Sequence, residues 1–198
     1  MANLPMLGAH AVHVAVDVQR LFTEPPGWRV PDMALIVPRI AELTRAKPGR
    51  TLFTRFTVPR RAEEAPGNWR HFYDHWSAFT GAALPPDLVG LVDELAALAD
   101  EASTIDKPTY SAFEAPAFSE RLARFGADTI IFTGVETDIC VLGTLLTAVD
   151  RGFRVIAVAD ALASSSPAAH EATLRHILPR FDQQVEIATT AAVLAAWS

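Results

Sequence analysis

The sequence predicts an α/β fold in three layers, with helices on both faces of an open, mostly parallel, Rossmann-like sheet of six strands. Two observations carry this prediction. Short apolar runs such as 129–133 lack polar alternation, which is typical of strands buried on both faces. Amphipathic segments with short connections separate these runs, and strand–helix–strand units of this kind are parallel and right-handed.

The strands are predicted at 11–16, 51–56, 102–106, 129–133, 154–159 and 184–187, with the last strand at an edge. His13 lies inside the first apolar run, and we interpret it as a core or edge histidine rather than a ligand. A Pro-Pro-Gly turn is predicted at 25–27. No repeat or linker divides the chain, so we expect a single domain over residues 1–198.

The helices are predicted from apolar residues at helical spacing and from start and stop signals. They cover 32–46, 88–99, 116–125 and 141–149, followed by a helix opened by Ser166 and Pro167 and a last one capped by Thr190 that runs to Trp197. Asp32 is a candidate N-cap of the first helix. Gly152 follows the helix at 141–149 as a stop signal.

Residues 57–84 break the alternation and contain a dense cluster of aromatic side chains at 69–79. A long irregular insertion of this kind is either a lid or binding segment, or a surface excursion held by its own rings. His71 and His75 are four residues apart and would share a helical face. No Glu follows His71, as a zinc motif of the H-E-x-x-H type requires, so we expect no metal there.

Composition limits the class of protein and its partners. Half of the residues are hydrophobic, and the net charge of −6 without a basic stripe argues against nucleic acid and membrane partners. The chain has no secretory signal pattern and no apolar run long enough to span a membrane, so we expect a cytoplasmic protein. A single cysteine excludes an internal disulfide and a cysteine-rich zinc site.

That cysteine, Cys140, lies where the strand at 129–133 passes into a helix. The unpaired N–H groups of a helix start stabilise a thiolate, so we expect a lowered pKa and a nucleophile. The alternative is a small buried hydrophobe. Asp17 and Lys107 also follow predicted strands, and ligands of such folds bind beyond the carboxyl ends of strands. Asp17 could serve as a base or merely cap a turn, and Lys107 could hold anions or be a solvated cation.

Three stretches give the sequence a family resemblance. They are Val16-Asp17-Val18-Gln19 with Phe22, Asp106-Lys107 with Tyr110-Ser111-Ala112-Phe113, and Gly134-Val135-Glu136-Thr137-Asp138-Ile139-Cys140-Val141, with weak support from Ala159-Asp160-Ala161. In this order they resemble the isochorismatase-like cysteine hydrolases, which include nicotinamidases, N-carbamoylsarcosine amidases and ureidoacrylate amidohydrolases. The resemblance covers essentially the whole chain.

The resemblance implies roles for individual residues. Cys140 corresponds to the nucleophile, Asp17 to the general base and Lys107 to the charge-stabilising partner. It also implies a cis peptide bond between Val135 and Glu136, with the backbone N–H groups of Glu136 and Cys140 facing an oxyanion. Relatives are often dimers or tetramers, so we expect a homo-oligomer.

Two departures narrow the expected chemistry. Nicotinamidases carry a D-x-H metal motif after the second strand, whereas this chain reads Thr54-Arg55-Phe56-Thr57, which argues against that metal site and its pyridine substrate. Isochorismatases that cleave a vinyl ether lack the cysteine, so Cys140 favours acyl chemistry.

We therefore expect a cysteine-dependent amidohydrolase that uses no cofactor, since no dinucleotide fingerprint or P-loop is present. Its substrate would be a small amide or ureido compound, hydrolysed through a thioester. The alternatives are an isochorismatase-type vinyl-ether hydrolase and a non-catalytic small-molecule-binding or redox-sensing relative. The expected substrate pocket is formed by Gln19, Phe22, Trp69, Tyr73, Trp76, Tyr110 and Phe113.

Overall fold

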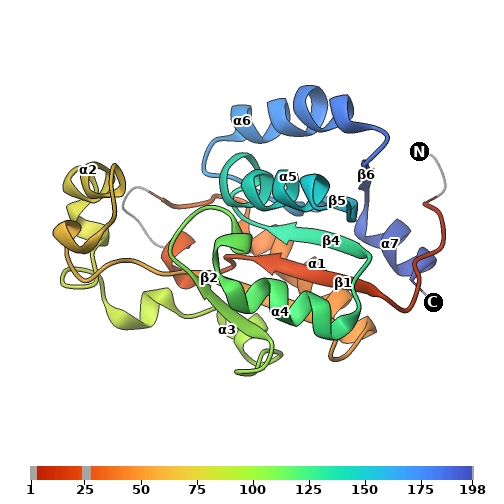
Figure 1. Cartoon of the computed structure of the whole chain (residues 1–198), viewed down its shortest axis with the longest axis horizontal. Helices are drawn as coiled ribbons and strands as arrows, with labels where there is room; N and C mark the ends of the chain where they lie inside the picture. The colour runs from red at the N-terminus through yellow and green to blue at the C-terminus, as the bar shows by residue number, and fades with distance from the viewer. Residues whose placement is uncertain (1–3, 24–27, 198) are drawn as a thin grey trace.

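Figure 1 shows the computed structural model, which describes residues 4–23 and 28–197. The sheet has six strands in the order β3-β2-β1-β4-β5-β6, and each neighbouring pair is parallel. The strands are β1 Ala11–Val16, β2 Thr51–Phe56, β3 Thr104–Lys107, β4 Thr129–Gly134, β5 Arg154–Leu162 and β6 Val185–Ala188. The predicted α/β class and parallel sheet are confirmed, and the turn predicted at 25–27 lies outside the described residues.

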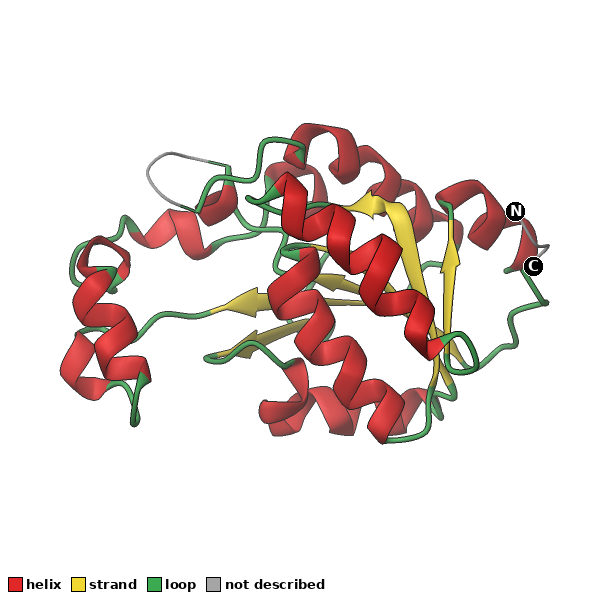
Figure 2. Ribbon diagram, turned by 90° about the horizontal axis from the view of Figure 1, so that it is seen from above, coloured by secondary structure: helices red, strands yellow, loops and turns green. Residues whose placement is uncertain are grey.

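Helices cover both faces of this sheet (Figure 2). They are α1 Met33–Ala46, α2 Trp69–His75, α3 Asp93–Ala96, α4 Pro116–Phe125, α5 Leu142–Asp150, α6 Pro167–Ala172 and α7 Thr190–Ala196. Buried side chains of α1, α3 and α7 form one core, and those of α4 and α5 form the other. Within the described residues no helix is long and apolar enough to cross a membrane.

Each core takes alternate residues from the central strands, as the two-residue period of a strand requires. In β1, Ala11 and Ala15 face the first core, and Val12, Val14 and Val16 face the second. His13 is fully buried between Thr51 Oγ1 at 3.1 Å and Thr133 Oγ1 at 2.8 Å. It is therefore a hydrogen-bonded core histidine, as predicted.

The helix predicted at 88–99 does not form as one element. The structure has a 3₁₀ turn at Pro86–Val89 and then the short α3. Between them Leu91 forms an isolated antiparallel bridge with Gln19. The backbone at this point pairs with the segment that follows β1 instead of continuing a helix, which apolar spacing alone could not reveal.

The helix caps agree with the sequence in part. Ser166 accepts a hydrogen bond from the N–H of Ala169, as an N-cap should. The last helix is capped by Thr189 rather than Thr190, because the N–H and hydroxyl of Thr190 donate to Asp160 instead. Asp32 precedes α1 but makes no capping hydrogen bond.

The ends of β1 and β4 meet with no room for a side chain. Gly134 ends β4 with φ of 103°, and a Cβ atom there would lie 2.1 Å from the carbonyl oxygen of Val16. Only glycine tolerates both the positive φ and this approach. A single π-helical turn, Thr137–Val141, then leads into α5. The corner therefore brings the turn that contains Cys140 next to the end of β1.

Residues 57–84 fold as α2 between two 3₁₀ turns, at the end of the molecule on the left of Figure 1. The rings of Phe72 and Trp76 pack on Trp28, with centroid distances of 5.8 and 5.9 Å. His71 and His75 are exposed on α2. Among the described residues, no group of three or more His, Cys, Asp or Glu side chains is arranged to hold a metal.

Candidate active site

Asp17 and Lys107 form a buried ion pair at the carboxyl ends of the strands. Asp17 directly follows β1, Lys107 ends β3, and both side chains are fully buried. Lys107 Nζ lies 2.7 Å from Asp17 Oδ2 and donates to the carbonyl of Thr109 at 2.9 Å. Asp17 Oδ1 accepts a 2.6 Å hydrogen bond from Thr54 Oγ1. These contacts compensate the cost of burying two charges and fix their positions.

Cys140 lies beside this pair. Burial raises the pKa of the Cys140 thiol well above its usual value, the charge of Asp17 raises it further, and Lys107 acts in the opposite direction. The prediction that the helix start lowers this pKa is therefore wrong, because Cys140 is only 5 % exposed and its thiolate loses more from desolvation than the helix start supplies. Burial is the largest single effect on the pKa of Lys107 and lowers it, but the charges of Asp17 and Cys140 and the hydrogen bonds to them together outweigh it, so the pKa is raised.

The turn before Cys140 has an unusual backbone. The peptide bond between Val135 and Glu136 is cis. The carbonyl of Glu136 accepts hydrogen bonds from the N–H groups of Ile139 and Val141, each at 3.1 Å. Among the hydrogen bonds of the described residues, none uses the N–H of Glu136. The turn that leads to Cys140 thus contains a backbone donor without a partner in the described part of the chain.

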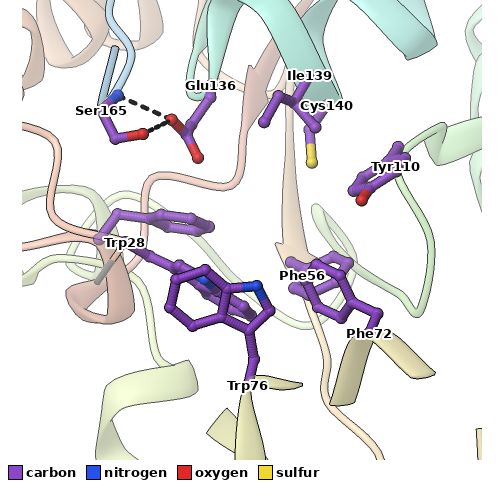
Figure 3. Close-up of a pocket in the computed structure, with 10 residues that line it drawn as sticks. Trp28, Phe56, Phe72, Trp76, Tyr110, Glu136, Ile139, Cys140 and Ser165 are labelled. Carbon is purple, nitrogen blue, oxygen red and sulfur yellow. Dashed lines mark hydrogen bonds between the residues drawn. The ribbon is translucent and has the colours of Figure 1, made fainter. Parts of the chain in front are cut away.

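A cavity of about 220 Å³ opens onto Cys140. Figure 3 shows the sulfur pointing toward a group of aromatic rings that face it across this space. Tyr110 and Ile139 line the cavity and are partly exposed, so they lie toward its mouth. The residues that line it are Phe22, Trp28, Phe56, Phe72, Trp76, Tyr110, Glu136, Ile139, Cys140 and Ser165.

Phe22, Trp76 and Tyr110 were expected in this pocket and line it, but four other expected residues do not. Gln19 binds backbone instead: its Oε1 accepts from the N–H of Phe56, and its amide nitrogen donates to the carbonyls of Phe56 and Val89.

The other three are aromatic. Phe113 lies in the second core, with its ring centroid 4.9 Å from that of Phe118. Trp69 and Tyr73 form a layer behind the lining, against Tyr110 and Phe72 respectively. The expectation is corrected for all four residues.

The lining also includes side chains that the sequence analysis missed. Phe56 is the last residue of β2, so its place at a strand end was the signal that could have identified it. Phe72 lies within the aromatic cluster at 69–79, but its orientation depends on the rotation of α2. Trp28 and Ser165 lie in connecting segments without periodicity, and the sequence offers no signal for them.

Comparison with known proteins places this geometry in a family. The family model of the isochorismatase domain matches residues 11–192. The chain belongs to the isochorismatase family. Across almost its full length it superimposes on a cysteine hydrolase from Pseudomonas syringae pv. phaseolicola 1448A. The TM-score is 0.80 at 25% identity, over 99% of this chain and 98% of that one.

Two curated relatives, a nicotinamidase and an amidohydrolase, match this chain over shorter stretches. Nicotinamidase 3 of Arabidopsis thaliana is 38% identical over 73 residues, which are 37% of each chain. Ureidoacrylate amidohydrolase RutB of Methylorubrum extorquens is 33% identical over 93 residues, 46% of this chain and 38% of RutB. The matches thus span well under half the length of these two relatives.

Proposed function

We propose that this isochorismatase-family protein is a cysteine-dependent amidohydrolase that acts on a small amide or ureido compound through a thioester. The observation that carries the proposal is the Asp17–Lys107 ion pair beside Cys140 at the wall of a cavity. The names of a nicotinamidase, an amidohydrolase and a cysteine hydrolase among its relatives favour the same chemistry.

In the first half-reaction the Cys140 sulfur attacks the substrate carbonyl carbon while the Asp17 carboxylate accepts the thiol proton. The raised pKa of Cys140 keeps the thiol protonated at rest, so proton transfer accompanies attack. The oxyanion accepts hydrogen bonds from the backbone N–H groups of Glu136 and Cys140. When it collapses, the C–N bond breaks and the leaving nitrogen takes the proton from Asp17.

In the second half-reaction Asp17 takes a proton from water, whose oxygen attacks the thioester carbon. The second oxyanion occupies the same site. Its collapse breaks the C–S bond, releases the acid and returns a proton from Asp17 to the sulfur. Lys107 remains an ammonium throughout and holds Asp17 in position, because its pKa is raised and the ammonium also donates to the carbonyl of Thr109 and lies over the Phe56 ring.

The alternatives fit the site less well. A redox sensor needs an accessible thiol of low pKa, whereas Cys140 is buried and has a raised pKa. A binding protein gains nothing from a fully buried ion pair beside its only cysteine. A vinyl-ether hydrolase would rely on Asp17 as an acid and would leave Cys140 without a role.

The test is a panel of small amides and ureido compounds assayed for ammonia release, with Cys140→Ala as the inactive control. We expect release that depends on Cys140 and survives exhaustive chelation, since the D-x-H metal motif is missing. Hydrolysis of the best substrate by Cys140→Ala at a near-normal rate would overturn the proposal and favour acid–base chemistry centred on Asp17.

A further inference from the structure

The side chain of Glu136 has no role in the reaction described above, which uses only its backbone N–H. It lines the same cavity as Cys140 and is 8 % exposed. Among the described residues no Lys or Arg lines this cavity, so Glu136 is not neutralised from within it. A buried carboxylate is costly unless it is hydrogen-bonded or paired with a cation.

The two carboxylate oxygens of Glu136 have different surroundings. Oε2 accepts hydrogen bonds from Ser164 Oγ at 3.1 Å, from the Ser165 N–H at 2.8 Å and from Ser165 Oγ. No hydrogen bond to Oε1 is found in the part of the chain that the structure describes. Figure 3 shows this second oxygen turned away from Ser165, toward the space that the sulfur also faces. The serines therefore orient the carboxylate and leave one oxygen for a ligand.

Aromatic rings form the wall opposite Glu136. Trp28 is their centre, with ring-centroid distances of 6.1 Å to Phe56, 5.8 Å to Phe72 and 5.9 Å to Trp76. One face of the Trp28 ring stacks on Phe79 at 4.0 Å, so a ligand would meet its other face or edge and the neighbouring rings. Figure 3 shows these rings below the carboxylate and the sulfur. The faces of aromatic rings attract cations, and tryptophan does so most strongly. Several rings together with one carboxylate form the kind of cage that binds alkylammonium groups.

We propose that Glu136 and this aromatic wall bind an alkylammonium group of the substrate, so that the preferred substrate is a small amide or ureido compound with a positive charge. This rests on the proposed amidohydrolase function, because it places the cation and the scissile carbonyl in one cavity. The volume of about 220 Å³ is below that of pockets for drug-sized ligands and suits a compact molecule. A carboxylate-bearing amide would meet repulsion from Glu136.

Three matched probes test the proposal: γ-trimethylammoniobutyramide, its neutral isostere with carbon in place of the quaternary nitrogen, and glutaramate, which ends in a carboxylate. Their binding is measured by titration calorimetry on Cys140→Ala, which cannot turn them over. The same titrations are repeated after adding Glu136→Gln, since glutamine can still accept the serine hydrogen bonds. Glu120→Gln is the matched control, because it removes an equal charge from the exposed surface of α4.

We expect the cationic amide to bind about tenfold or more tightly than the neutral isostere, and glutaramate to bind weakest. Glu136→Gln should remove most of this preference, and Glu120→Gln should leave it unchanged. Equal binding of the cationic and neutral amides overturns the proposal. So does a preference that survives Glu136→Gln, or failure of the cationic amide to bind at millimolar concentration.

Turnover by the protein with Cys140 intact separates this proposal from the proposed reaction. Charge-dependent binding without ammonia release from any amide would refute the amidohydrolase function and leave the cation site intact. Ammonia release from neutral or acidic amides with no preference for cations would refute the cation site and leave the amidohydrolase function intact. A purely structural role of Glu136, as the hydrogen-bond acceptor of Ser164 and Ser165, would not make binding depend on ligand charge.

Discussion

The acidity of the Cys140 thiol depends on two neighbouring charges that act in opposite directions. Asp17 raises its pKa and Lys107 lowers it, on top of the larger effect of burial. Turnover in the proposed mechanism needs both residues, since one accepts the proton and the other holds the acceptor. Thiol reactivity and hydrolysis should therefore respond differently to the two substitutions.

We predict that Asp17→Asn lowers the pKa of Cys140 and speeds its alkylation by iodoacetamide, although hydrolysis falls by about a hundredfold or more. Lys107→Met should raise the pKa and slow alkylation about tenfold or more at the same pH, and hydrolysis should fall as well. Alkylation rates measured against pH report both shifts.

A suitable control for these variants is Arg55→Met, which removes a cation that pairs with the partly exposed Asp106. Its alkylation profile should match that of the unmodified protein. If Asp17→Asn and Lys107→Met moved the alkylation profile in the same direction, the opposing charge effects at Cys140 would be wrong.

His13 makes stability depend on pH. Burial lowers its pKa from 6.5 to about 3. The unfolded chain therefore binds a proton that the folded protein excludes, so stability is complete above the unfolded pKa and is lost as pH falls toward the folded one. From about pH 7 to about pH 5 this should cost about 2 kcal/mol of unfolding free energy.

Urea unfolding at both pH values measures this loss, and His13→Gln provides the comparison. Glutamine cannot titrate but can hydrogen-bond to Thr51 and Thr133. The variant should therefore show a flatter pH dependence, even if it is less stable overall. An unchanged loss of stability in His13→Gln would assign the effect to other groups.

At the scale of residues, the sequence indicated the side chains that converge at the strand ends better than the side chains that line the cavity. Asp17, Lys107 and Cys140 could be found because each follows or ends an apolar run, and parallel strands bring such positions together. The residues that line the cavity could not all be predicted, because Trp28 and Ser165 lie in connecting segments that have no periodic pattern. The pKa of Cys140 was predicted with the wrong sign because the degree of burial is a property of the whole fold.

At the scale of elements, the corner between β4 and the π turn determines the position of the thiol. Gly134 lies where a Cβ atom would overlap the carbonyl oxygen of Val16. The strands and long helices were predictable from apolar runs and spacing, since burial on two faces leaves that signature. The interruption at Leu91 of the helix predicted at 88–99 was not predictable, because it arises from pairing with Gln19, which is far away in sequence.

Gly134→Ala should therefore destabilise the protein by about 4 kcal/mol or more, through both the positive φ and the overlap with Val16. Gly152→Ala is the matched control, since Gly152 also has a positive φ of 82° but open space around it. It should cost about 1–2 kcal/mol. Urea midpoints of the two variants give the difference, and similar values would mean that the close approach is unimportant.

At the scale of the whole molecule, the proposed reaction predicts a covalent form of the intact chain. When turnover is stopped by rapid acid quenching, the intact mass should increase by that of the acyl group. The adduct should map to the peptide that contains Cys140. Cys140→Ala should show neither adduct nor activity and keep its circular dichroism spectrum, because alanine is easily accommodated in a buried helical turn. Turnover without any adduct on Cys140 would exclude the thioester.

The three proposed catalytic residues come from opposite halves of the sheet. Asp17 and Lys107 accompany β1 and β3, whereas Cys140 follows β4, which pairs with β1 across the centre. During synthesis, the ion pair is therefore complete in sequence before β4 has left the ribosome. A nascent chain thus contains both members of the proposed acid–base pair before it contains the proposed nucleophile.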